Sequence, residues 1–171
     1  MHNGDDTAYY LRKGFRVVGV EANPFLAELC RRRFASAIDR EALIVLNVWI
    51  SAQEGPQTFW VNQVHSEFSS FLSSHACREG QETIPLQVSG VSFASIVAKY
   101  GVPFYLKSDI EKCDPCCLSA LDPNDLPRYI SVEAHEESYL LALHRLGYNA
   151  FKCVDQTAHN FRRDFGPTWF R

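Results

Sequence analysis

The sequence lacks a long hydrophobic run, an excess of basic residues and an export signal. No stretch approaches the ~20 consecutive apolar residues that a membrane-spanning helix needs, so we expect no contact with a membrane. The formal net charge of −3 offers no basic field for nucleic acid. The amino end carries Asp5 and Asp6 and no apolar segment of the signal-peptide type. We therefore expect a cytoplasmic protein that binds neither nucleic acid nor membrane.

Cysteine is present, but without the spacing of a metal site. Cys113 and Cys116 form a CxxC pair, and the remaining Cys and His residues are too scattered to supply the second close pair of a zinc site. A disulfide framework is not expected without an export signal. The CxxC pair follows a predicted strand and opens a predicted helix, where a thiol pKa is lowered. A thiol-redox domain that uses Cys113 and Cys116 is therefore an alternative hypothesis.

The chain does contain a repeated alternation of strand-like and helix-like segments. Its 171 residues, 46% hydrophobic and 22% charged, fit a single globular domain spanning 1–171. The strand-like segments are apolar without the alternation of half-exposed strands, which predicts a mainly parallel sheet with helices on both faces. The predicted class is α/β, a doubly wound and Rossmann-like fold. Ligands of such folds bind beyond the carboxyl ends of the strands.

Hydrophobic period and Gly, Pro and Ser positions give the expected boundaries. Strands are predicted at residues 15–20, 43–50, 59–61, 84–88, 104–110, 129–132 and 150–154. Helices are predicted at residues 7–13, 24–38, 93–100, 116–121 and 136–146, with Ser92 as an N-cap. The polar, serine-rich residues 63–82 are predicted to form a loop.

Acidic and amide side chains follow several of these strands at the point where each strand ends. The carboxyl ends of parallel strands meet at one edge of a sheet, so we expect these side chains to converge there. A loop, a helix, a strand and a terminal acid, in that order, are how a doubly wound fold binds an adenosine. The strand-end residues are Glu21, Asn47, Ser51, Asp109, Glu111, Glu133 and His135.

Six segments, in order along nearly the whole chain, resemble the FkbM family of S-adenosylmethionine-dependent methyltransferases. They are residues 3–10 (NGDDTAYY), 18–24 (VGVEANP), 46–51 (LNVWIS), 66–71 (SEFSSF), 106–111 (LKSDIE) and 130–135 (ISVEAH). The resemblance implies methyl transfer from S-adenosylmethionine to a hydroxyl of a small-molecule or glycan-like acceptor. It depends on the combination of the six segments, since each segment alone is short.

The resemblance also implies roles for individual residues. The loop of Asn3, Gly4, Asp5 and Thr7 would receive the methionine carboxylate through its backbone and the following helix N-terminus. Glu21 would bind the ribose hydroxyls, with Ala22 and Asn23 in the turn beneath. The remaining implied cofactor contacts are Asn47, Ser51, Ser69, Ser70, Asp109 and Glu111. A hydroxyl acceptor needs a general base, for which Asp109, His135 and Glu133 are the candidates; Asp109 with Glu133 could instead hold a divalent cation.

The chain departs from the family pattern at several points. The first strand of the family would precede His2, and relatives continue beyond Arg171, so both ends are expected to be truncated. Trp49 stands where the family has a small residue, Ser108 replaces an aliphatic residue and Lys112 replaces a glycine. A missing central strand would leave sheet edges uncovered and favour self-association. A non-catalytic remnant of the fold is therefore a further alternative.

Overall fold

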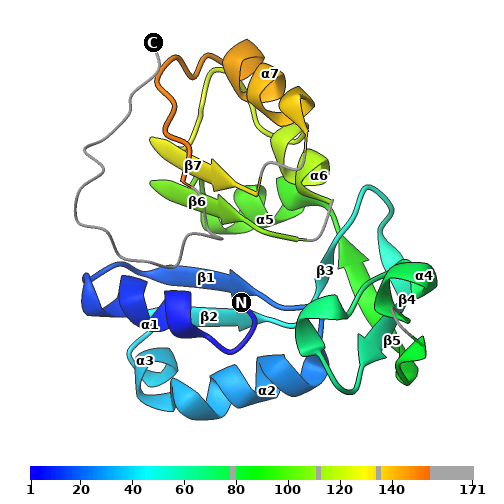
Figure 1. The fold of residues 1–171 in the computed structure, drawn as a ribbon. Helices are drawn as coiled ribbons and strands as arrows, with labels where there is room; N and C mark the ends of the chain where they lie inside the picture. The colour runs from blue at the N-terminus through cyan, green and yellow to red at the C-terminus, as the bar shows by residue number, and fades with distance from the viewer. Residues whose placement is uncertain (78–79, 111–112, 134–135, 155–171) are drawn as a thin grey trace.

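The computed structural model describes residues 1–77, 80–110, 113–133 and 136–154 (Figure 1). In chain order the elements are α1 (Asp5–Arg12), β1 (Val17–Val20), α2 (Pro24–Arg33), α3 (Ala35–Asp39), β2 (Leu43–Leu46), β3 (Trp49–Ile50), β4 (Gly55–Asn62), the 3-10 helix η1 (Ser66–Phe68), α4 (Ser73–Ala76), β5 (Thr83–Val91), α5 (Phe93–Tyr100), β6 (Tyr105–Ser108), α6 (Asp114–Leu118), β7 (Tyr129–Val132) and α7 (Glu137–Leu146). Within these ranges, no helix has the length and hydrophobicity needed to cross a membrane.

The strands confirm an α/β protein but form three small sheets where one mainly parallel sheet was predicted. β1 pairs with β2 in parallel, and β6 pairs with β7 in parallel. The third sheet has the order β3-β5-β4, and its long pair, β4 with β5, is antiparallel. The predicted single strand over 43–50 is wrong, because it divides into β2 and β3, which belong to different sheets. Asn47 lies between β2 and β3, and its side-chain amide donates to the Glu21 and Ala22 carbonyl oxygens. These hydrogen bonds fix the chain where it passes from one sheet to the other.

Local sequence explains where the helices begin and end. Pro24 occupies the first turn of α2, where its missing N–H costs nothing, and the Asn23 side chain accepts a hydrogen bond from the Phe25 N–H. The predicted helix over 24–38 is two helices, α2 and α3, because Phe34 leaves the helical conformation, with φ −115°. Ser92 caps α5 as predicted by accepting from the Ser95 N–H.

Three further predictions need correction. The predicted loop over 63–82 contains the short helices η1 and α4. The predicted strand over 150–154 is wrong, since that segment has only a single bridge residue, at Phe151. The predicted helix over 116–121 begins two residues earlier and ends at Leu118, because Pro115 occupies its first turn.

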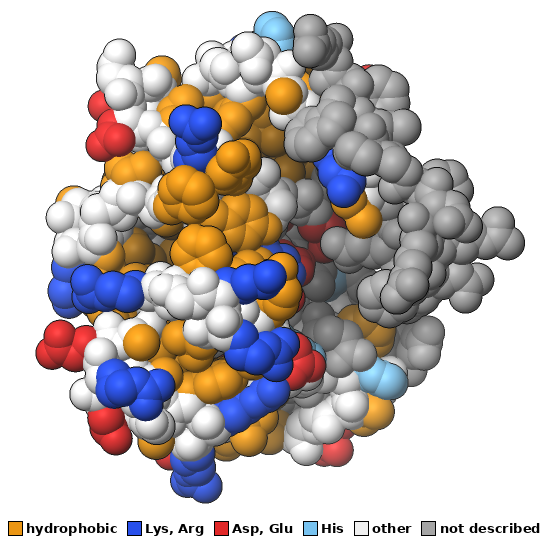
Figure 2. Space-filling model, turned by 90° about the vertical axis from the view of Figure 1, so that its left-hand side faces the viewer, with side chains coloured by type: hydrophobic (Ala, Val, Ile, Leu, Met, Phe, Trp, Pro, Cys, Tyr) orange, Lys and Arg blue, Asp and Glu red, His pale blue; other side chains and the backbone are white. Residues whose placement is uncertain are grey.

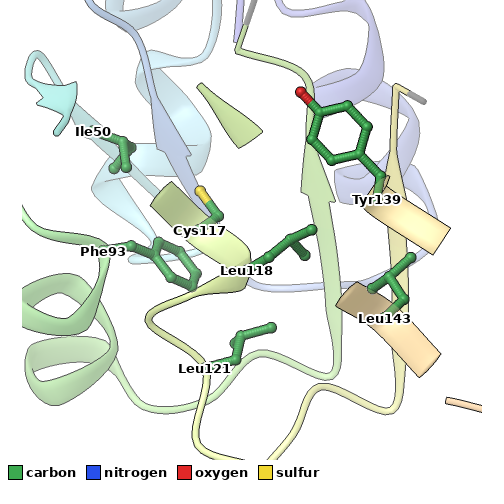
Figure 3. Packing of buried hydrophobic residues seen from close by; sticks show 7 residues of the cluster. All are labelled: Ile50, Phe93, Cys117, Leu118, Leu121, Tyr139 and Leu143. Atoms are coloured by element: carbon green, nitrogen blue, oxygen red, sulfur yellow. The ribbon is translucent and has the colours of Figure 1, made fainter. Parts of the chain in front are cut away.

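The main hydrophobic core lies between α5, α6, α7 and the strands β6 and β7. Its buried members are drawn in Figure 3 and are Ile50, Phe93, Cys117, Leu118, Leu121, Tyr139 and Leu143. Val20 of β1 and Leu106 of β6 pack against the same cluster, so the core connects two sheets that share no strand pairing. A second, smaller cluster of Phe59, Val61 and Val88 lies within the β3-β5-β4 sheet.

Candidate functional site

One large cavity extends along β1 and β6 and reaches the carboxyl ends of both strands. Its volume is about 830 Å³, within the range of pockets that hold cofactor-sized ligands. All of the residues of β1 and β6 line it. It also gathers most of the predicted site residues into one place. Those that line it are Asn3, Asp5, Thr7, Glu21, Ala22, Asn23, Ser69, Ser70, Asp109 and Glu133.

Glu21 lies at the carboxyl end of β1 with its side chain only 11% exposed. Its Oε1 accepts a hydrogen bond of 2.9 Å from the Asn23 N–H, and its Oε2 accepts one of 2.7 Å from the His2 N–H. The Met1 amino group lies 3.3 Å from Oε2. A carboxylate has about four acceptor positions, so these three donors leave roughly one position for a hydroxyl of a ligand. A second hydroxyl would have to displace the Met1 amino group.

The loop before α1 is attached to α2 by Arg33. The Arg33 guanidinium donates to the Asn3 carbonyl oxygen at 2.7 Å and to the Asp5 carboxylate at 2.9 Å. Hydrogen bonds from Arg33 and then from the Asn3 amide lower the pKa of Asp5 below its usual value. Gly4 sits between them with φ +86°, a left-handed conformation that glycine adopts without strain. Arg33 thus fixes the loop in the conformation that leads into the N-terminus of α1.

Ser69 and Ser70 enter the cavity from the end of β4 and η1. The Ser70 backbone forms two hydrogen bonds with Trp60 of β4, which fixes the position of both serines. The Ser69 hydroxyl accepts from the Asn62 N–H, and the Ser70 hydroxyl accepts from the Leu72 N–H. In the described part of the chain neither hydroxyl donates to a protein group, so both O–H groups can donate to a molecule in the cavity.

Asp109 follows β6 and pairs with Lys107, the same lysine that pairs with Asp6 of α1. The Lys107 ammonium lies 3.3 Å from the Asp109 carboxylate and hydrogen-bonds to Asp6. Burial alone would lower the pKa of Lys107, but the two carboxylates outweigh it and raise the pKa, so Lys107 is a fixed positive charge at this rim. Sequence reasoning missed Lys107 and Asp6. A lysine in the middle of the predicted strand over 104–110 was the signal for the first.

Several predicted site residues lie elsewhere. Asn47 and Ser51 do not line the cavity: Asn47 holds the turn after β1, and the Ser51 hydroxyl accepts from the Gln53 N–H and the Gln57 amide. Gly4 also does not line it, although its neighbours do. Glu111 and His135 lie outside the described residues. Of the predicted strand-end residues, Glu21, Asp109 and Glu133 line this cavity.

Metal and thiol chemistry receive no support from the described residues. There, no three His, Cys, Asp or Glu side chains are grouped so that they could hold a metal ion. All six cysteines are free thiols. Burial, followed by the charges of Cys116 and Asp114, raises the pKa of Cys113 to about 11. The redox hypothesis expects a lowered pKa at this helix start, so the shift has the opposite sign to the one required.

Two aromatic features at the cavity were not predicted. Trp49 and Phe71 stack with ring centroids 3.8 Å apart, and Phe59 lies against Phe71. Trp49 and Phe59 line the cavity beside the two serines.

Compared with known proteins, the chain matches no family model, no curated protein and no solved structure.

Proposed function

We propose that the chain has the nucleoside-binding site of a doubly wound, Rossmann-like S-adenosylmethionine-dependent methyltransferase, of the FkbM type that its motifs resemble. The observation that carries the proposal is the position of Glu21. It stands at the carboxyl end of a parallel strand, next to a helix N-terminus, in a cavity that also contains Ser69, Ser70 and Asp109. This is where open α/β sheets bind nucleotides.

The donors and acceptors of the cavity fit such a cofactor. Glu21 would accept a ribose hydroxyl, and the two serine hydroxyls would donate to its polar groups. The loop from Asn3 to Thr7 would face the amino-acid end, and the Trp49 and Phe59 rings supply apolar surface beside it. S-adenosylmethionine supplies, when bound, an electrophilic methyl group on a sulfonium.

The residues of this chain would then orient an acceptor and remove its proton. Methyl transfer is an in-line displacement, so alignment of the acceptor oxygen supplies much of the rate. The hydroxyl proton of the acceptor would pass to a base of this chain as the methyl group is transferred. Asp109 and Glu133 line the cavity and are the described candidates for that base; His135 remains a candidate from the sequence. The proposed acceptor is a hydroxyl of a small or glycan-like molecule.

Replacing Glu21 with Gln tests the assignment by calorimetric titration with S-adenosylhomocysteine. The amide keeps one acceptor oxygen but loses the charge, and a hydrogen bond to a charged group contributes about 1.5–3 kcal/mol. We expect the dissociation constant to rise at least about tenfold. Glu28→Gln is the matched control, because Glu28 lies on α2 outside the cavity and, among the described residues, pairs only with Arg31 and Arg32. Equal affinity in the two variants would contradict the role of Glu21.

A non-catalytic remnant of the same fold is the second candidate. One observation favours it: the three sheets are not joined into one. A remnant predicts no heat of binding from S-adenosylhomocysteine in the unaltered chain. The methyltransferase proposal predicts saturable binding with one molecule per chain.

A further inference from the structure

A second, smaller cavity lies beside β2. Its volume is about 430 Å³, at the lower end of the range for ligand pockets. Arg16 precedes β1 and Glu21 follows it, so the rise of the strand places Arg16 about 16 Å from Glu21. Three of the lining residues also line the large cavity. The smaller cavity, called the β2 pocket below, is lined by Arg16, Arg31, Ile38, Glu41, Leu43, Ile44 and Val45.

One wall of the β2 pocket is aliphatic. Ile38 comes from α3, and the other aliphatic residues are Leu43, Ile44 and Val45 of β2. Leu43 is 1% exposed, and the other three are half-buried. A branched aliphatic group of a ligand would therefore make hydrophobic contact on this wall.

Two arginines of the β2 pocket have unused hydrogen-bond donors. Within the described residues Arg16 forms no hydrogen bond or ion pair, and Arg31 lies 3.9 Å from Glu28, beyond hydrogen-bond distance. Arg32, the next residue of α2, donates to Glu28 at 2.9 Å. Figure 2 views the molecule from the side on which β1 and β2 begin and shows Lys and Arg side chains among hydrophobic ones there. A guanidinium group fits the two oxygens of a carboxylate, so this side of the pocket suits one.

Glu41 stands where glycine is the usual residue. After α3 the Glu41 N–H donates to the Ile38 carbonyl oxygen, and the following N–H, of Ala42, donates back into the helix as well. This helix ending requires a left-handed residue, and Glu41 has φ +56°, which strains a residue with a Cβ. Among the described residues the Glu41 carboxylate forms no hydrogen bond or ion pair that would offset the strain. Strained residues are concentrated at ligand-binding positions, and a carboxylate there suits a positively charged group.

We propose that the β2 pocket binds a free α-amino acid with an apolar side chain. The ligand carboxylate would bind to Arg16 and Arg31, and the ligand ammonium group would bind to Glu41. The ligand side chain would lie on the aliphatic wall. A ligand with a single charge would leave either Glu41 or the two arginines without a partner, whereas a small zwitterion satisfies both signs of charge.

The probe is leucine, titrated into the isotopically labelled chain and followed by amide chemical shifts. We expect saturable shifts at Arg16, Ile38, Glu41 and Val45, with one molecule bound per chain. Three related compounds test the parts of the ligand separately: glycine lacks the apolar side chain, leucinamide lacks the carboxylate and N-acetylleucine lacks the ammonium group. We expect glycine to bind at least about tenfold more weakly than leucine. We expect each of the other two to bind at least about fivefold more weakly.

Two pairs of variants test the residues. Arg31→Gln should weaken leucine binding at least about fivefold, whereas Arg32→Gln, on the same helix but outside the pocket, should not change it. Glu41→Gly should unfold at a higher urea concentration, because glycine adopts the left-handed conformation without strain. The same variant should bind leucine no better than N-acetylleucine. A residue with only a structural role would not combine higher stability with lost discrimination.

Four results would overturn the proposal. They are the absence of saturable shifts at the pocket up to the solubility limit of leucine, equal affinity for leucine and glycine, equal or tighter binding of N-acetylleucine by the unaltered chain, and equal losses in Arg31→Gln and Arg32→Gln. The proposal does not depend on cofactor binding, so a chain without affinity for S-adenosylhomocysteine can still bind the amino acid.

Discussion

A Leu118→Ala variant is expected to lose about 2–5 kcal/mol of unfolding free energy. Leu118 lies on α6 in the middle of the main core, with 3% of its surface exposed, between residues of α5 and α7 (Figure 3). Its removal leaves a cavity that two helices and a sheet would have to close together. Urea unfolding followed by circular dichroism measures the change.

The matched control is Leu141→Ala on α7, a leucine that is 57% exposed. It should change stability by no more than about 0.5 kcal/mol. Comparing the Leu118→Ala and Leu141→Ala variants also distinguishes a tightly packed core from a loosely collapsed one. A remnant with molten packing would respond equally to both substitutions, and that equality would contradict the core described above.

A Gly4→Ala variant is expected to lose about 2–5 kcal/mol of unfolding free energy, from two causes. A substitution at a second glycine separates them. At φ +86° an alanine is strained by about 1–2 kcal/mol. A Cβ at this position would also lie 2.5 Å from a ring carbon of Phe34 and 3.2 Å from the Cys30 sulfur, and such overpacking adds about 1–3 kcal/mol. The same urea experiment gives the loss.

Gly14→Ala isolates the first cause. Gly14 has nearly the same φ, +84°, but no atom lies within 4 Å of the Cβ that it would gain. We expect it to lose only the ~1–2 kcal/mol of backbone strain. Equal losses in the two variants would show that the loop before α1 does not pack on Phe34 as described.

The sequence predicted local structure well wherever a single residue decides it. Pro24, Ser92 and Gly147 mark helix ends by the chemistry of their own backbone or side chain, and those ends lie where they were expected. The division of 43–50 into two strands was not predictable, because a continuous apolar run carries no mark of a change of sheet. That division depends on the Asn47 amide and on a turn 25 residues earlier in the chain.

The candidate site was predictable only in part, for a related reason. Glu21, Asp109 and Glu133 each follow a strand, and strand ends can be read from hydrophobicity. Asn47 and Ser51 also follow strands, but their side chains bond to nearby backbone or side-chain groups, which the sequence pattern does not reveal.

Titration of the isotopically labelled chain with S-adenosylhomocysteine, followed by amide chemical shifts, tests the central claim most directly. The account predicts saturable shifts at Glu21, Asn23, Ser69, Ser70 and Asp109, which all line one cavity although they are far apart in sequence. Exposed amides of α3 and of the β4–β5 pair away from the cavity should not move. Unchanged spectra at saturating ligand, or shifts confined to residues outside the cavity, would contradict a nucleoside site at the carboxyl ends of these strands.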